Sequence, residues 1–247
     1  AYKKDGYVTV NGDMKSTEAF FFINSVSDIA AILSHCNLKD DEVKIVCADT
    51  EANRKKLAGY TISNSRAANK KFTFITSKSF EGADYYSEDA LCYVVSNSSN
   101  KNTLLDISTD IYQIAGRIRT ATNPFRNLII HIFNSAGQRR IEDIEYSELL
   151  ERVNKELKGT KLIVDFVNQN PEAKEGASKS FNQEYVYTDE NGLYRVNDMV
   201  AKLELYTFRL EQSIYKNGIE LRKAYEGTGA TTTDIDYTKI NETMEKA

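Results

Sequence analysis

The run Ala19-Phe20-Phe21-Phe22-Ile23 decides the fold, because an unbroken apolar stretch of this length is typical of a strand buried on both faces. Apolar residues then recur at helical spacing from Val26 to Leu33, and either Ser25 or Ser27 can cap the helix that they predict. A buried strand followed directly by an amphipathic helix is the first unit of an α/β fold.

The same unit repeats along the chain. Further apolar runs predict strands at 43–47, 72–76, 91–95 and 128–133. Asp49 or Thr50 can cap a short charged helix that runs to Leu57, and a second helix is expected from about Ser108 to Ile118. Alternating strands and helices with uninterrupted apolar strands predict a parallel sheet flanked by helices. We therefore expect an α/β domain over residues 18–140.

Two flanking regions differ from this pattern. Residues 1–17 predict a small hairpin, because Asn11-Gly12 supplies the positive φ angles of a tight turn. Residues 141–247 predict a mostly helical appendage, with helical periodicity at 146–157 and 199–215. A second hairpin is expected near 184–196, around the turn at 189–192.

Composition excludes some classes of function. Of 247 residues, 41% are apolar and 28% charged, and no stretch approaches the roughly 18 to 20 apolar residues of a membrane-spanning helix. We therefore expect no membrane contact. The three cysteines form no CxxC pair, so buried free thiols in a reducing cytoplasm are expected. A net charge of -4 argues against nucleic-acid binding through overall charge and leaves room for a local basic patch.

Two segments carry the residues best suited to chemistry, and both follow strands of the predicted sheet. The first is Thr76–Asp84 and the second is Gln113–Arg119. If residues 113–117 are helical, the amide of Gln113 and the guanidinium of Arg117 share a face beside the bare backbone of Gly116. This arrangement suits a phosphate-bearing ligand. The alternative is a solvated helix face on which Arg117 pairs with a nearby carboxylate.

The two segments resemble motifs V and VI of superfamily 2 (DEAD/DEAH-like) helicases. Thr-x5-Gly-x-Asp, formed by Thr76, Gly82 and Asp84, is similar to motif V, and Gln-x-x-Gly-Arg-x-Arg, from Gln113 to Arg119, is similar to motif VI. The strand end Phe21–Ser25 resembles motif IV. The resemblance covers roughly residues 18–135 and implies the second RecA-like motor domain of a helicase, followed by a helical extension.

This resemblance assigns catalytic and nucleotide-binding residues. It implies that Arg117 and Arg119 reach across a cleft to the β and γ phosphates of ATP, as arginine fingers. Gln113 and Gly116 would lie at the same nucleotide edge. Gly82 would permit a tight turn, and Asp84 would lie near the nucleotide and couple it to the nucleic acid.

The resemblance also assigns nucleic-acid contacts, namely Asn24, Ser25, Thr76, Ser77 and Lys78. The bound nucleic acid would be single- or double-stranded, and the form of motif VI favours DNA over RNA. Basic residues occur in two further groups and could either contact the phosphate backbone of a nucleic acid or form a solvated surface. The groups are Arg54–Lys56, Arg66, Lys70–Lys71 and Lys78, and then Arg139–Arg140.

The chain departs from the family pattern in two ways. Arg117 and Arg119 are two residues apart, where the family has three, and two residues differ by about 200° around a helix. Arg119 can therefore serve the same cleft only if the helix ends near Ile118. No G-x-x-x-x-G-K-[ST] phosphate loop and no magnesium-holding Asp-Glu pair occur, so ATP and Mg²⁺ would be held mainly by an upstream RecA-like ATPase domain absent from this chain.

Three functions remain open from the sequence. The first is the C-terminal motor half of an ATP-dependent helicase or translocase, which would be inactive in ATP hydrolysis by itself and has no metal site of its own. The second is a catalytically dead RecA-like module that binds nucleic acid or protein. A nucleotide-binding regulator is disfavoured by the missing glycine-rich loop. His35 and His131 are isolated in sequence and are assigned core or surface roles.

Overall fold

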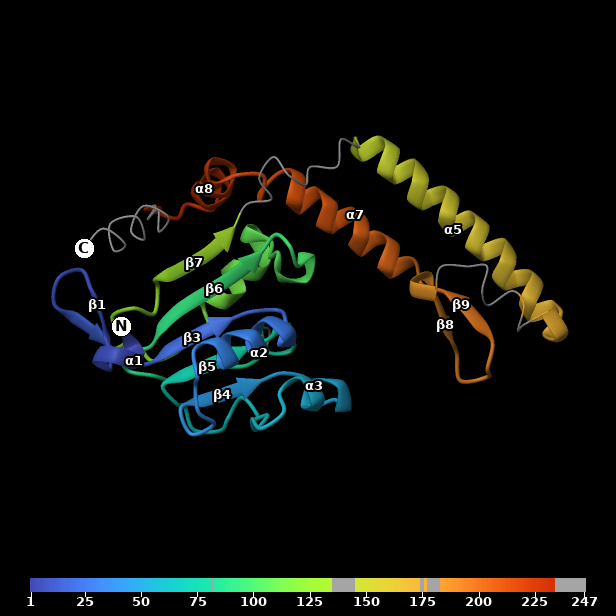
Figure 1. Cartoon of the computed structure of the whole chain (residues 1–247). Coiled ribbons are helices and arrows are strands. Elements are labelled where there is room, and N and C mark those ends of the chain that lie inside the picture. The colour runs from blue at the N-terminus through green and yellow to red at the C-terminus, as the bar shows by residue number, and fades with distance from the viewer. Residues whose placement is uncertain (81, 135–144, 174–175, 177–182, 234–247) are drawn as a thin grey trace. The chain divides into compact units, whose positions relative to one another are not determined.

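The structure is a computed structural model and describes residues 1–80, 82–134, 145–173, 176 and 183–233 (Figure 1). Contacts between residues divide the chain into two compact units. The first unit comprises Ala1–Ser96, Leu105–Ile132 and the chain from Asn217, and the second comprises Asn97–Leu104 and Phe133–Lys216. The domain boundary expected at residue 140 lies outside the described residues.

A five-stranded sheet forms the centre of the first unit. Its strands are β3 (Ala19–Phe22), β4 (Val43–Val46), β5 (Phe72–Ile75), β6 (Leu91–Asn97) and β7 (Ile129–Asn134), in the order β4-β5-β3-β6-β7. β3 lies between β5 and β6 and is parallel to both, with Phe20 opposite Thr73 and Cys92. The predicted α/β class, with a parallel sheet flanked by helices, is confirmed.

The helices that follow β3 and β4 each begin at one of the capping residues expected from the sequence. In α2 (Val26–His35), Ser25 is the N-cap, and its hydroxyl accepts a hydrogen bond from the Asp28 amide at 3.1 Å. In α3 (Glu51–Lys56), Thr50 is the N-cap, and its hydroxyl accepts from the Asn53 amide at 3.2 Å. Of the alternatives that the sequence left open, Ser25 and Thr50 are therefore the caps.

One face of the sheet packs on α2, which lies in front of the strands in Figure 1. The core on this face includes buried residues of α2, of the strands and of the short helix α1 (Tyr2–Asp5). Its largest members include Tyr2, Ile29, Leu33, Phe72, Phe74 and Phe125. The N-terminal helix is thus part of the sheet's core.

The opposite face of the sheet is covered by the segment that follows β5. Phe20 and Phe22 point to this side, because successive residues of a strand alternate between faces. The ring of Phe20 lies 5.6 Å from that of Tyr85, and the ring of Phe22 lies 5.6 Å from that of Phe80. The segment expected to carry motif V therefore lies directly against the sheet.

The helix predicted from Ser108 to Ile118 is shorter than expected. It begins as a π-helix, Ile107–Ile111, and continues as α4 (Tyr112–Ala115). The prediction of its C-terminal end was wrong because the backbone beyond Gly116 pairs with another segment, as described below. A periodic pattern in sequence does not reveal this competition for backbone hydrogen bonds.

The N-terminal hairpin is confirmed. β1 (Val8–Val10) pairs antiparallel with β2 (Met14–Ser16). Asn11 and Gly12 have φ angles of 50° and 94°, the left-handed conformation that Asn and Gly tolerate best.

The second unit is mostly helical and carries the second hairpin. α5 (Tyr146–Gln169) and α7 (Asp198–Gln212) enclose a core with Leu149, Val153, Tyr185, Ala201 and Phe208, and β8 (Val186–Thr188) pairs antiparallel with β9 (Tyr194–Val196). The predicted helical C-terminal part and its hairpin are confirmed. α8 (Gly218–Gly227) belongs to the first unit.

Short single-turn 3-10 helices occur at Ser77–Ser79, Lys101–Thr103, Pro171–Ala173 and Gln183–Tyr185. No helix in the described part of the chain is both long and apolar enough to cross a membrane.

Candidate nucleotide and nucleic-acid site

The two segments singled out in the sequence meet in a β-bridge. The amide of Tyr85 donates to the carbonyl of Arg117, and the amide of Arg119 donates to the carbonyl of Tyr85, each at 2.9 Å. Tyr85 and Ile118 form a parallel bridge, and both side chains are buried. The side chains that flank them along the two segments therefore face outward.

Asp84 joins the two segments on this outward face. Its Oδ1 atom lies 2.8 Å from Nε of Arg119 and 3.9 Å from Nη1 of Arg117. One carboxylate thus lies within ion-pair distance of two guanidinium groups. The alternative that Arg117 contacts a nearby carboxylate agrees with this geometry, and the carboxylate belongs to the other segment.

The two arginines differ in burial. The side chain of Arg117 is 14% exposed, and its Nε donates to the main-chain carbonyl of Gln113 at 3.0 Å. The side chain of Arg119 is 49% exposed. The predicted shared helix face is wrong, because α4 ends at Ala115 and Arg117 lies beyond it. The same early end satisfies the condition under which Arg119 can reach the face that Arg117 occupies.

The two glycines of these segments differ in backbone conformation, and therefore in whether a side chain could replace them. Gly82 has a φ angle of 75°, so a side chain at this position would strain the turn. Gly116 has a φ angle of -87°, and an added Cβ would lie 3.8 Å from Nη1 of Arg119, an ordinary contact. The local conformation therefore requires glycine at residue 82 and tolerates alanine at residue 116.

The residues assigned to nucleic acid lie at the carboxyl ends of the adjacent strands β3 and β5. The amide of Ser77 donates to Oδ1 of Asn24 at 3.3 Å, and Ser77 and Lys78 are exposed. Ser25 is the cap of α2. Thr76 is buried, and its hydroxyl donates to the Val46 carbonyl at 3.4 Å. The structure thus brings the two strand ends together and leaves Ser77 and Lys78 as the exposed members.

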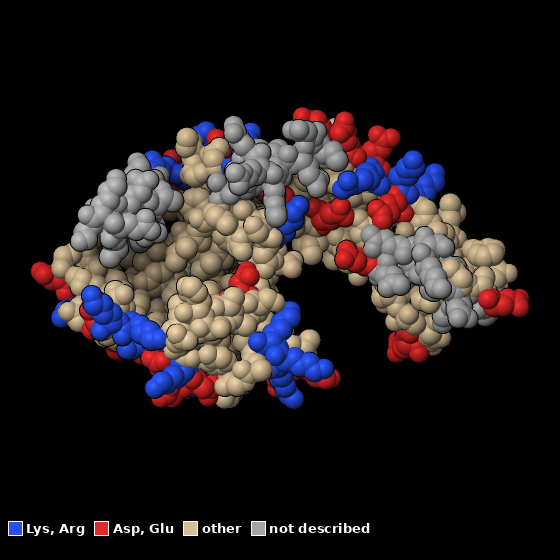
Figure 2. Space-filling model, in the orientation of Figure 1, with Lys and Arg blue, Asp and Glu red and all other residues tan. Residues whose placement is uncertain are grey.

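Basic side chains gather over α3, as Figure 2 shows. Arg54 binds Asp49 through two nitrogens at 2.6 and 2.8 Å, and Lys55 pairs with Glu51 at 2.8 Å. These contacts partly neutralise the patch, so its positive charge is smaller than the sequence indicates. The basic pair Arg139–Arg140 lies outside the described residues.

Lys44, a lysine inside the otherwise apolar strand β4, is a buried polar centre that was not predicted. Lys44 is 1% exposed, and its Nζ donates to the carbonyls of Ser65 at 2.9 Å and Ala67 at 2.5 Å and to Oδ1 of Asn69 at 3.4 Å. Burial lowers its pKa below the ordinary lysine value. A charged residue within a buried strand was the signal that could have indicated this site.

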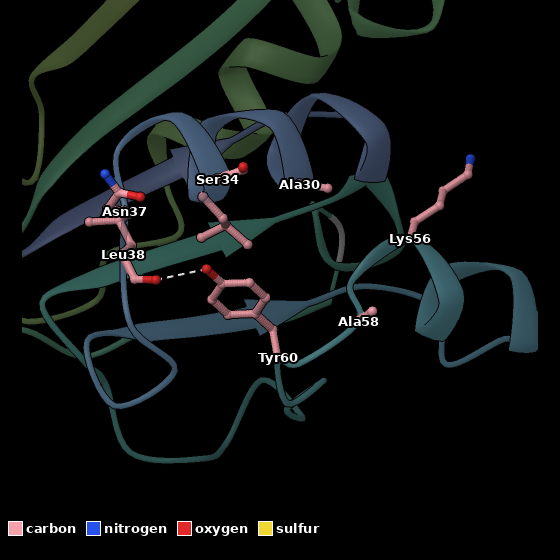
Figure 3. A pocket seen from close by; sticks show the side chains of 8 residues that line it. Ala30, Ser34, Asn37, Leu38, Lys56, Ala58 and Tyr60 are labelled. Atoms are coloured by element: carbon pink, nitrogen blue, oxygen red, sulfur yellow. Dashed lines mark hydrogen bonds between the residues drawn. The ribbon is translucent and has the colours of Figure 1, made fainter.

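A pocket of about 510 Å³ lies apart from these residues, between α2 and the segment after α3 (Figure 3). Tyr60 closes one side of it, and its hydroxyl donates to the Leu38 carbonyl at 2.7 Å. Ser34, Asn37 and Lys56 add polar groups to its wall. The described residues that line this pocket include none of the candidate site residues.

The donor chemistry of the site fits phosphate. Two guanidinium groups on one face are suited to anionic oxygens, whereas no group of three or more side chains that could hold a metal ion occurs among the described residues.

No family model, curated protein or solved structure matches the chain.

Proposed function

We propose that the chain is the C-terminal motor half of a cytoplasmic, ATP-dependent helicase or translocase of superfamily 2, acting on DNA rather than RNA. The observation that supports the proposal is the contact of Asp84 with both Arg117 and Arg119. It brings together residues of the two helicase-like segments on one accessible face.

The two arginines have separate tasks in this proposal. Arg119 is half-exposed and exchanges Asp84 for the terminal phosphates of ATP held by an upstream RecA-like domain. Arg117, more buried and bound to the Gln113 carbonyl, fixes the geometry of the pair and adds positive charge beside the same phosphates. Stabilisation of charge on the transferring phosphoryl group by such arginines accelerates hydrolysis by about 10³ to 10⁵. Magnesium, held by the upstream domain, would neutralise part of the phosphate charge.

The same segment carries both proposed contacts. Ser77 and Lys78 are exposed at the carboxyl end of β5 and would hold a nucleic-acid phosphate. A short stretch of chain, with its turn at Gly82, leads from Lys78 to Asp84. A shift of the strand end on nucleic-acid binding would therefore reach the arginine pair through covalent connection.

ATP hydrolysis by the full-length protein, with and without single-stranded DNA, tests the proposal. We expect DNA-stimulated hydrolysis that falls by about 10³ to 10⁵ in Arg119→Ala, with ATP binding retained. Arg195→Ala is the matched control, because Arg195 also pairs with a carboxylate at 2.9 Å and is 51% exposed, on the hairpin of the second unit. Equal loss in both variants, or hydrolysis unaffected by Arg119→Ala, would contradict the proposal.

A second candidate is a RecA-like binding module without hydrolysis. The exposure of Ser77 and Lys78 at the carboxyl end of β5 supports it, because a phosphate contact at these residues does not require ATP. DNA binding that is weakened by Lys78→Ala, in a full-length protein that does not turn over ATP, would support the module and exclude the motor.

A further inference from the structure

The outward face of the Tyr85–Ile118 bridge carries one more side chain than the helicase-like motifs explain. Burial alternates along this segment: Ala83, Tyr85 and Ser87 are buried, whereas Asp84 and Tyr86 are exposed. This alternation is that of an extended strand, in which every second side chain shares a face. Tyr86 therefore projects from the same face as Asp84.

Tyr86 also lies beside Arg119. In a parallel bridge that pairs Tyr85 with Ile118, the next residues along the two segments are neighbours, namely Tyr86 and Arg119. The segments stay together beyond this point, because the amide of Ser87 donates to the Thr120 hydroxyl at 2.9 Å. One surface thus carries an aromatic side chain and the side chain of Arg119 at neighbouring backbone positions.

The main chain at Tyr86 is fixed by a hydrogen bond from the side chain of Asn69. Nδ2 of Asn69 donates to the Tyr86 carbonyl at 2.6 Å, and Oδ1 of Asn69 faces Nζ of the buried Lys44 at 3.4 Å. Nζ of Lys44 also lies 5.5 Å from the centre of the Tyr85 ring. Tyr86 is 67% exposed although its main-chain carbonyl is held by Asn69, so its side chain is presented to solvent at low entropic cost.

We propose that Tyr86 stacks on the base of the nucleoside triphosphate whose phosphates meet Arg117 and Arg119. This inference rests on the proposed function and adds the group that recognises the base. Stacking of a base on an aromatic side chain changes affinity by roughly 5- to 150-fold. A nucleotide is favoured over a nucleic-acid base because Tyr86 lies beside Arg119, whereas the exposed residues assigned to nucleic acid lie at the end of β5.

The composition of the chain offers a direct probe, because it contains no tryptophan. Tyr86→Trp introduces a single indole at an exposed position where it does not disturb the core. Titration of this variant of the 247-residue chain with ATP should quench the indole fluorescence. Inorganic triphosphate should bind the same arginines, as heat of binding in calorimetry, and should leave the fluorescence unchanged.

Two variants separate stacking from general effects. Tyr187→Trp is the matched control, because Tyr187 is 52% exposed and lies on β8, in the second unit. Its fluorescence should not respond to ATP. Adding Arg119→Ala to Tyr86→Trp should move the midpoint of the ATP titration to a concentration at least about tenfold higher, because the phosphate contact is lost.

The possible outcomes of these titrations distinguish a failure of the stacking proposal from a failure of the proposed function. ATP and triphosphate that bind equally well without change at residue 86 would overturn the stacking by Tyr86 and leave the arginine site intact. Quenching by single-stranded DNA in place of ATP would overturn it as well, because the stacked base would belong to nucleic acid. A midpoint of the ATP titration that Arg119→Ala leaves unchanged would count against both the stacking and the proposed function, because the bound phosphates would then lie away from the arginine pair. In the full-length protein, Tyr86→Ala should raise the KM for ATP by roughly 5- to 150-fold and change kcat little, whereas Tyr86→Phe should restore the KM.

Discussion

Oδ1 of Asp84 accepts a hydrogen bond from Nε of Arg119 at 2.8 Å, and this contact joins two segments far apart in the sequence. Asp84 follows the turn at Gly82, and Arg119 follows the end of α4. The contact depends on the bridge between Tyr85 and Ile118, which holds both backbones in register. The arginine pair is therefore organised by a neighbouring segment and not by its own helix.

Replacing Asp84 should affect function more than stability. The pair is about half-exposed, and exposed ion pairs contribute roughly 0 to 1 kcal/mol, so Asp84→Asn should change the free energy of unfolding by less than about 1 kcal/mol. Urea denaturation measures this change, with Glu51→Gln at another exposed pair as the control. A much larger loss in Asp84→Asn alone would show that the carboxylate anchors the fold.

The two arginines should differ in their contribution to stability. Arg117 is mostly buried and donates to the Gln113 carbonyl, so Arg117→Ala should cost roughly 1.5 to 3 kcal/mol. Arg119→Ala should cost less than about 1 kcal/mol, because its side chain is half-exposed. Comparison of the urea midpoints of the two variants checks the order, and equal midpoints would contradict the distinction between them.

His131 should make the stability of the first unit depend on pH. Its Nδ1 lies 2.7 Å from the Tyr225 hydroxyl and its Nε2 lies 2.9 Å from the Ser96 hydroxyl. Burial lowers its pKa to about 3, whereas the unfolded chain takes up the proton at about pH 6.5. The unfolded state binds the proton first as the pH falls, so the stability contributed by neutral His131 is complete above about pH 6.5 and is lost towards about pH 3.

The measurement is urea denaturation at about pH 7.5 and about pH 5. The difference in unfolding free energy between the two pH values should shrink in His131→Gln and persist in His35→Gln, since His35 is exposed at the end of α2. An unchanged difference in His131→Gln would assign the pH dependence to other groups.

The cysteines should report the fold directly. Cys36 is exposed, so the expectation of a buried thiol was wrong for this residue, whereas Cys47 and Cys92 are buried. Burial raises the pKa of Cys92 to about 12. Because the thiolate is the reactive form, only Cys36 should react with a thiol reagent in the native chain. All three thiols should react in urea, and rapid reaction of Cys92 under native conditions would contradict its place in β6.

Replacement of Lys44 should increase the backbone mobility of residues 65–69, which contact the main chain of Tyr86 through Asn69. Lys44→Met leaves the carbonyls of Ser65 and Ala67 without this donor, at a cost of roughly 1 to 3 kcal/mol. Faster amide hydrogen exchange at residues 65–69 and at Ser87 would follow from the loss. Lys56→Met, at the end of α3, is the control and should leave this exchange unchanged.

Much of the fold could be predicted from the sequence because it depends on local patterns. The apolar runs predict strands, Ser25 and Thr50 are among the caps that the sequence allows, and Asn11-Gly12 predicts a turn with positive φ. The end of α4 could not be predicted in the same way. The backbone of Arg117 and Arg119 has a choice between helical hydrogen bonds and those with Tyr85, and only the folded chain makes the second choice.

The sequence by itself determined the α/β class, the two hairpins and the residue types suited to phosphate. These follow from hydrophobic periodicity, turn chemistry and fixed charge, which act over a few residues. Only the tertiary structure decided that Asp84 pairs with both arginines, that Thr76 is buried and that Tyr86 faces outward beside Arg119. The physical reason is that each of these features depends on hydrogen bonds and burial between segments that meet only when the sheet has formed.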